Sequence, residues 1–112
     1  MNLQETVSKL VKELNLVKLT EAGMDKEITD VYIGDLLSIV MSKCQEGSAW
    51  ITSQTHMNIV QVADLNDAAC IIIAGGAQVE DSIISKAEDA GVSILSSDKE
   101  SYELAWKIHE VL

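Results

Sequence analysis

The sequence has no phenylalanine and no proline, and aromatic residues make up only 4% of it. A folded core must therefore consist mainly of Ile, Val, Leu, Met and Ala, which dominate the 47% of residues that are hydrophobic. Such aliphatic cores suit parallel sheets, whose strands are covered on both faces. Because no apolar run reaches membrane-spanning length and the first residues lack the apolar stretch of a signal peptide, we expect a cytoplasmic protein.

Basic residues are scarce as well. Lys and Arg number 8 against 18 Asp and Glu, which gives a formal net charge of −10. Binding to DNA, RNA or an anionic membrane surface needs a basic face, so the composition argues against a nucleic-acid partner and against a membrane partner. The charge favours solubility and carries no information about the fold.

Only two cysteines are present, Cys44 and Cys70, and both stand in apolar settings. Two scattered thiols cannot hold an iron–sulfur cluster or a closed zinc site within one chain, so we expect buried, reduced side chains. Neither a metal-ligand spacing nor a G-x-G-x-x-G or G-x-x-x-x-G-K-[ST] motif occurs. The sequence thus predicts no metal and no cofactor, and it disfavours a dinucleotide fold and a P-loop kinase.

Apolar residues alternate between helical spacing and short strand-like runs along the chain. Strands are expected over residues 16–20, 28–33, 49–52, 69–74 and 92–95, and helices over 2–14, 36–44, 56–65, 79–90 and 98–112. The segment 56–65 also has strand character, and we assign it to a helix because a strand–helix–strand rhythm surrounds it. The alternation predicts a single α/β domain with a mostly parallel sheet of four or five strands and helices on both faces.

Several residues are predicted to mark the ends of these helices. Asn2 with Glu5 and Ser97 with Glu100 fit capping boxes, and Asp35 fits an N-cap. The expected helix ends are Asn15, Gly47 and Gly91.

Two side-chain placements follow from the same spacing. The last helix is expected to bury Tyr102, Ala105, Ile108 and Leu112, with Trp106 at its margin. The acidic pairs Glu80-Asp81 and Glu88-Asp89 are expected to form a solvated helix face.

Ligands of open parallel sheets bind beyond the carboxyl ends of the strands. Four polar or glycine-containing segments are predicted there, and three of them precede a helix, whose free N–H groups and dipole favour an anion. Each residue could equally be a turn or capping residue, since caps and anion sites share one geometry. The candidate ligand-binding residues are Gly34, Asp35, Ser53, Gln54, Thr55, His56, Asn58, Gly75, Gly76, Ser96 and Ser97.

His56 is the residue in this set with the most versatile chemistry. Beside Gln54 and Asn58 it could act as an acid, a base or a donor to a ligand. No Ser or Cys nucleophile with a matching base accompanies it, and His109 falls on the surface of the last helix. We therefore predict no catalytic residue and a protein that is not an enzyme, with an enzyme using His56 as an alternative.

Three stretches together resemble the DRTGG domain family. They are Val31-Tyr32-Ile33-Gly34-Asp35-Leu36-Leu37-Ser38, Trp50-Ile51-Thr52-Ser53-Gln54-Thr55-His56-Met57-Asn58-Ile59-Val60 and Ile71-Ile72-Ile73-Ala74-Gly75-Gly76. The resemblance covers residues 28–112 and leaves 1–27 as an N-terminal helix and first strand of one DRTGG-like domain, 1–112. Within the family, the sequence most specifically resembles small stand-alone members that accompany hydrogenase and iron–sulfur protein genes.

The resemblance implies a small α/β domain similar to the N-terminal domain of HPr kinase/phosphorylase. It also implies a regulatory or ligand-sensing module, often dimeric, that takes no part in catalysis. Other members carry an Asp-Arg pair where this chain has Gln54-Thr55 or Thr55-His56, so a function that depends on that pair is not carried over.

Three functions remain open at this point. The first is a regulatory domain that binds a small anionic ligand, a nucleotide or phosphometabolite, as a homodimer. The second is an interaction accessory of a hydrogenase or another iron–sulfur enzyme, without a small-molecule site. The third is the enzyme using His56. The homodimer is expected because small domains with apolar helix faces often bury them against a second copy.

Overall fold

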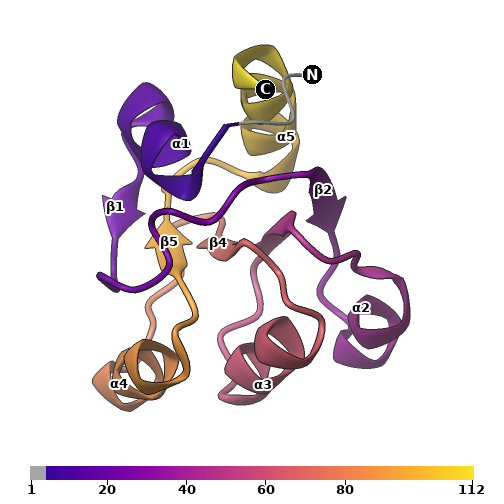
Figure 1. The fold of residues 1–112 in the computed structure, drawn as a ribbon, viewed down its shortest axis with the longest axis vertical. Helices are drawn as coiled ribbons and strands as arrows, with labels where there is room; N and C mark the ends of the chain where they lie inside the picture. Colours follow the sequence, from indigo (N-terminus) through magenta and orange to yellow (C-terminus); the bar gives the residue numbers. More distant parts are fainter. Residues whose placement is uncertain (1–4) are drawn as a thin grey trace.

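The computed structural model describes residues 5–112 and shows the predicted α/β fold (Figure 1). The strands stand in the order β1-β5-β4-β3-β2, and all neighbours are parallel except β1, which pairs with β5 in the antiparallel sense. The elements are α1 (Val7–Leu14), β1 (Val17–Lys18), β2 (Asp30–Ile33), α2 (Leu37–Lys43), β3 (Ser48–Thr52), α3 (Asn58–Leu65), β4 (Cys70–Ile73), α4 (Asp81–Ala90), β5 (Ile94–Ser96) and α5 (Ser101–Val111).

The sheet separates two hydrophobic clusters. Alternate side chains of β4 point to opposite faces, so Ile72 packs with α1 and α5 while Ile71 and Ile73 pack with α2, α3 and α4. Figure 1 shows the same division, with α1 and α5 on one side of the sheet and the other three helices on the other side. Every residue of β3 and β4 is buried, as expected for central parallel strands.

The two cysteines are buried and free, as predicted. Cys44 belongs to the cluster beneath α2–α4 and Cys70 to the cluster beneath α1 and α5, so the sheet lies between them. Burial raises the pKa of the Cys70 thiol to about 12 and also raises the pKa of Cys44. Both side chains are therefore protonated, apolar parts of the core at neutral pH.

The first helix begins later than predicted. Thr6 is its N-cap and its Oγ1 accepts the N–H of Lys9 at 3.3 Å, while Glu5 stands before the helix and pairs with Lys9 at 2.8 Å. Asn2, the other half of the expected capping box, lies outside the described residues. Asn15 ends the helix in the left-handed conformation, as predicted.

The second helix ends through a contact that sequence reasoning missed. It stops at Lys43, before the expected terminator Gly47. The side-chain amide of Asn66, just after α3, donates to the carbonyls of Val40, Met41 and Cys44 at 3.0–3.2 Å. The last carbonyls of a helix generally need partners from outside it. The Val40 carbonyl also accepts the Cys44 N–H at 2.8 Å, and Asn66 adds the bonds that satisfy the end of α2 and bind α2 to α3.

The last helix buries a different residue from the one expected. Tyr102 is 82% exposed, whereas Leu104 is buried. Leu104 and Ile108 are one turn apart and share the line that faces the sheet, and Tyr102 lies about half a turn away from that line. The prediction for Tyr102 was wrong, while Ile108 and Leu112 are buried and Ala105 packs against the core as expected.

The remaining elements agree with the sequence to within two residues. The segment 56–65 contains a helix, α3, and Gly91 ends α4 in the left-handed conformation. The last strand, β5, extends to Ser96, one residue past its predicted end. None of the helices in residues 5–112 is long and apolar enough to cross a membrane.

Two glycines with the same left-handed backbone should respond differently to a methyl group. Gly47 (φ +79°) faces the Thr29 side chain, which a Cβ would overlap, whereas Gly91 (φ +73°) has open space there. We expect Gly91→Ala to cost about 1 kcal/mol of unfolding free energy from backbone strain alone. Gly47→Ala should cost clearly more, about 3 kcal/mol, since overlap adds to strain. Urea unfolding of both variants measures the difference, and equal losses would contradict it.

Candidate functional site

The connections that follow β4 and β5 leave the sheet toward opposite faces. The chain after β4 enters α4, which packs on one face through Ile83, and the chain after β5 enters α5, which packs on the other face through Leu104. Adjacent parallel strands whose connections diverge in this way leave a crevice at their carboxyl ends. The fold thus places the most favourable ligand position between these two strands.

A cavity of about 560 Å³ lies at this position, and we call it the β4–β5 cavity. Its size falls within the range of small-molecule sites. One wall of the cavity comes from the end of α1 and from β1. Because β1 runs antiparallel to β5, the start of β1 lies beside the carboxyl end of β5. The lining residues are Leu14, Asn15, Val17, Leu19, Gly76, Ala77, Gln78, Val79, Ser96, Ser97, Asp98 and Lys99.

The glycine pair joins the two loops beside this cavity. Gly75 N–H donates to the Lys99 carbonyl at 2.8 Å and Gly76 N–H donates to the Ser97 carbonyl at 2.9 Å. Both glycines have left-handed backbones, and a Cβ on Gly75 would press on the Glu100 carboxylate. The amides of Gly75 and Gly76 are therefore already used, and a ligand would have to rely on other donors.

The expected capping box after β5 does not form. Glu100, not Ser97, occupies the N-cap position of α5, and it makes no side-chain capping bond. The Ser97 hydroxyl instead accepts the N–H of Lys99 at 3.1 Å, which shapes the loop at the cavity. The prediction was wrong because the turn supplied a closer backbone donor.

The polar and apolar sides of the cavity are distinct. Leu14, Val17 and Leu19 supply the apolar wall from the N-terminal segment. Lys99 is the one cation among the lining residues, and its ammonium lies 3.9 Å from the Asp98 carboxylate in a loose, exposed pair. Such a pair is weak enough for a ligand anion to compete with Asp98 for Lys99.

Glu88 holds the turn that follows the β1 wall. Its carboxylate accepts the N–H of Glu21 at 2.7 Å and the N–H of Ala22 at 2.9 Å. Of the two acidic pairs expected to be solvated, Glu80, Asp81 and Asp89 are exposed, and Glu88 is half-buried in this contact. The sequence pattern gave no indication of the Glu88 contact, because the two backbone donors are more than sixty residues away.

Glu88→Gln should therefore destabilise the fold, whereas the neighbouring Asp89→Asn should not. An amide at position 88 presents an NH₂ group to one of the two backbone donors and loses at least one charge-assisted bond, for which we expect about 1–2 kcal/mol. The exposed Asp89→Asn should stay within about 0.5 kcal/mol of the wild type. Chemical unfolding at neutral pH compares them, and equal stability of both variants would contradict the anchoring role.

The other predicted site residues lie at the carboxyl end of β3. Asp35 was expected to cap α2, but Leu36 holds the N-cap position without a side-chain bond. The Asp35 carboxylate instead accepts the Thr52 hydroxyl at 2.7 Å and the Ser53 N–H at 2.8 Å. It therefore ties the end of β2 to the end of β3.

The residues after Ser53 bond to one another and to the backbone. Gln54 Oε1 accepts the N–H of His56, and His56 Nδ1 accepts the N–H of Asn58, both at 3.1 Å. Met57 is the N-cap of α3, and it makes no side-chain capping bond. His56 is exposed and does not line the β4–β5 cavity. Gly34 accepts the indole N–H of the buried Trp50 at 2.9 Å.

The structure thus divides the predicted ligand-binding residues into two groups, both at the carboxyl ends of the strands. Gly76, Ser96 and Ser97 line the β4–β5 cavity, with Gly75 adjoining it. The second group shapes the β2–α2 and β3–α3 connections and comprises Gly34, Asp35, Ser53, Gln54, Thr55, His56 and Asn58.

The bonds to Asp35 predict an acid-dependent contribution to stability. They lower its pKa, with the Ser53 N–H as the largest cause and the Thr52 hydroxyl next. A lowered folded-state pKa gives stability that is present above the unfolded value, about 3.9, and is lost as pH falls through the folded value. Asp35→Asn should be less stable than the wild type at pH 7, with the difference shrinking below about pH 4. Unfolding curves from pH 7 to pH 2.5 test this, and a pH-independent difference would contradict it.

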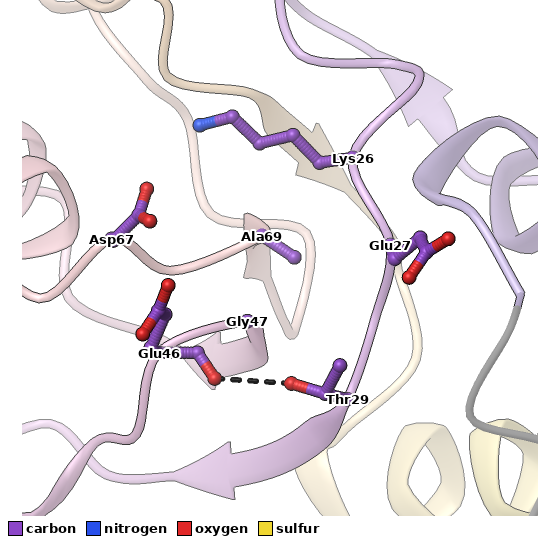
Figure 2. A pocket seen from close by; sticks show the side chains of 7 residues that line it. All are labelled: Lys26, Glu27, Thr29, Glu46, Gly47, Asp67 and Ala69. Carbon is purple, nitrogen blue, oxygen red and sulfur yellow. Dashed lines mark hydrogen bonds between the residues drawn. The ribbon is translucent and has the colours of Figure 1, made fainter.

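A second cavity lies at the opposite end of the strands, beside the residues that precede β2, β3 and β4 (Figure 2). Its volume is about 490 Å³, and Thr29 donates to the Glu46 carbonyl at its rim at 3.0 Å. Residues 5–112 contain no group of three His, Cys, Asp or Glu side chains close enough to hold a metal ion. Sequence patterns missed this cavity because three separate turns form it. It is lined by Lys26, Glu27, Thr29, Glu46, Gly47, Asp67 and Ala69.

A third hollow, about 580 Å³, lies between α1 and α5. Its charged side chains come from both helices, and Lys107 pairs with Glu103 at 3.3 Å while its ammonium lies over the Trp106 ring. These local pairs satisfy Lys107, so the hollow offers less to a ligand than the β4–β5 cavity.

Comparison with known proteins identifies the family and supports the fold. The family model of the DRTGG domain matches residues 9–111 and so includes most of α1 and all of β1, which the sequence resemblance left out. The fold is similar to the crystal structure of the CBS and DRTGG domains of the regulatory region of a Clostridium perfringens pyrophosphatase, complexed with the activator diadenosine tetraphosphate. The TM-score is 0.77 at 14% identity, over 96% of this chain and 47% of that chain. No curated protein matches the sequence.

Proposed function

Since the chain belongs to the DRTGG domain family, we propose that it is a non-catalytic regulatory domain that binds a small anionic ligand in the β4–β5 cavity. The observation that carries the proposal is the position of this cavity, where the connections after two adjacent parallel strands diverge. Open sheets bind their ligands at such points. The Gly76, Ser96 and Ser97 positions expected from the sequence contribute to its lining.

The cavity favours a ligand with an apolar ring and one or more phosphates. Leu14, Val17 and Leu19 offer a surface on which a base or another flat ring could lie. Lys99 would pair with a phosphate in place of Asp98, and the Ser96 and Ser97 hydroxyls are within the same lining. The similar pyrophosphatase region was crystallised with diadenosine tetraphosphate, which makes nucleotides the first class to test.

The other two functions have less support. An interaction accessory of a hydrogenase or another iron–sulfur enzyme stays a prediction from family resemblance. The enzyme using His56 is disfavoured by the contacts of that residue, because Gln54, His56 and Asn58 bond within one turn and do not converge on a cavity.

The test is a thermal-shift and calorimetric titration of the protein with AMP, ADP, ATP, diadenosine tetraphosphate and sugar phosphates. A nucleotide that binds should raise the unfolding temperature. At a concentration of a hundred times its dissociation constant, it should add about 2.7 kcal/mol to the unfolding free energy. Lys99→Ala should weaken that binding about tenfold or more, the usual loss for a charge-assisted bond.

Lys107→Ala is the matched control. The side chains of Lys99 and Lys107 are 35% and 33% exposed, each pairs with an acidic residue, and each change removes one positive charge. Lys107 lines the hollow between α1 and α5, which shares Leu14 with the β4–β5 cavity, but Lys107 itself does not line that cavity. Equal weakening by both variants would show a general charge effect, and no saturable binding of any compound at millimolar concentration would reject the proposal.

A further inference from the structure

The cavity beside the residues that precede β2, β3 and β4 holds charged side chains of both signs (Figure 2). Lys26 comes from the segment before β2, Glu46 from the turn before β3 and Asp67 from the turn before β4. We call this cavity the Lys26 cavity. Its volume of about 490 Å³ is within the range of small-molecule sites. The length of the strands separates it from the β4–β5 cavity, so the two are different places on the fold.

Lys26 is a half-buried cation without an acidic partner. Three of the lysines in residues 5–112 are half-buried, and two of these, Lys99 and Lys107, pair with a carboxylate. Lys26 is the third, and within this part of the chain its ammonium forms no ion pair. The chain has 18 acidic residues against 8 basic ones, so a shortage of carboxylates is not the reason. Because charges removed from water are generally paired, this ammonium is suited to an anionic group that a ligand supplies.

The charge of Lys26 acts on the inner end of the cavity. Burial raises the pKa of the Cys70 thiol to about 12, and the positive charge of Lys26 offsets part of that rise. Cys70 is the first residue of β4, and Ala69 just before it is buried and lines the cavity. Since the interaction between charges weakens with distance, the ammonium lies near the amino end of β4.

Two carboxylates accompany Lys26 on the same side of the cavity. In Figure 2 the Lys26 side chain extends toward the side on which the Asp67 and Glu46 carboxylates stand. The carboxylate of Glu27, which also lines the cavity, is turned the other way in this view. One ammonium and two carboxylates therefore face the space that a ligand would fill, and they leave an excess of one negative charge.

Backbone bonds hold the three segments in place around this space. The Gly47 N–H donates to the Asp67 carbonyl and the Thr29 N–H donates to the Gly47 carbonyl, both at 2.9 Å. The turn that carries Asp67 is thus tied to the turn before β3, and that turn is tied to the start of β2. Walls that are fixed before a ligand arrives reduce the entropy lost on binding.

We propose that the Lys26 cavity binds a basic amino acid, with the ligand carboxylate on Lys26 and its cationic groups on Asp67 and Glu46. A ligand with only negative groups would be repelled by the two carboxylates, and one with only positive groups would meet the Lys26 ammonium. An amino acid with a cationic side chain carries both signs and a net charge of +1, which neutralises the excess. The protein charge of −10 also attracts such a ligand.

The test is a calorimetric titration with L-arginine, with agmatine, which is arginine without its carboxylate, and with L-glutamate. Arginine should bind saturably with a dissociation constant below about 1 mM. Agmatine should bind about tenfold more weakly or worse, the usual loss for one charge-assisted bond. Glutamate, with a second carboxylate, should not bind in this range. The amide NMR signals of Gly47 and Ala69 should shift with arginine, because both residues line the cavity.

Two variants separate the two halves of the site. Lys26→Met keeps the aliphatic stem and removes the ammonium, so it should weaken arginine binding about tenfold and abolish the preference for arginine over agmatine. Asp67→Asn should weaken both ligands about tenfold, because both carry the cationic groups. Asn tolerates the left-handed backbone of Asp67, φ +51°, so this variant should keep the turn.

Asp25→Asn is the matched control for Asp67→Asn. Asp25 is exposed, stands next to Lys26 in the chain and does not line the cavity, and the substitution removes the same charge. Arginine affinity should stay within about twofold of the wild type, since exposed charges outside a contact contribute little. Circular dichroism checks that each variant is folded.

Three results would overturn the proposal. The first is no saturable binding of arginine to the wild type at millimolar concentration. The second is binding of agmatine or glutamate as tight as that of arginine, which would contradict the assigned charges. The third is an equal loss with Asp25→Asn and Asp67→Asn, which would show attraction by the overall charge and no site at the cavity. A failure of nucleotides to bind the β4–β5 cavity would leave these results unaffected.

Discussion

The burial of β4 is the constraint on which the rest of this structure depends. Cys70–Ile73 are inaccessible on both faces and are bordered by a strand on each side. A strand of that kind requires helices above and below, and the chain supplies them unequally, with α2, α3 and α4 on one face and α1 and α5 on the other. The change of face occurs between α4 and α5, so the connections that follow β4 and β5 diverge. The β4–β5 cavity is a consequence of that change.

The glycine pair has a structural reason that is independent of any ligand. Gly75 and Gly76 turn the chain away from β4 in a left-handed conformation and donate to carbonyls of the loop after β5. They fix the distance between the two loops, and so the width of the cavity. The glycine pair therefore supports the walls of the proposed site, while Lys99, Ser96 and the apolar residues of the N-terminal segment are among the residues that line it.

Sequence periodicity predicted the α/β architecture, the central strand and four of the residues at or beside the cavity. The predictions from local sequence were wrong where a polar side chain had both a local and a distant hydrogen-bond partner within reach. Asp35 is a sound N-cap by local rules, yet it bonds to Thr52 and Ser53 seventeen and eighteen residues away.

The same limit explains the other errors. The end of α2 is satisfied by Asn66, which no local pattern could pair with it. The apolar wall of the cavity requires knowing that β1 joins β5, and strand order is a property of tertiary structure. Tyr102 and Leu104 differ only in which side of one turn faces the sheet, and an aliphatic side chain is the easier one to bury there.

The β4–β5 cavity and the edge strand β2 stand at opposite ends of the strand order. The buried strands β3 and β4 lie between them, and close-packed interiors resist continuous deformation. Binding of a ligand in the cavity can therefore change the surface at β2 only if the whole domain has two discrete arrangements and the ligand binds one of them more tightly.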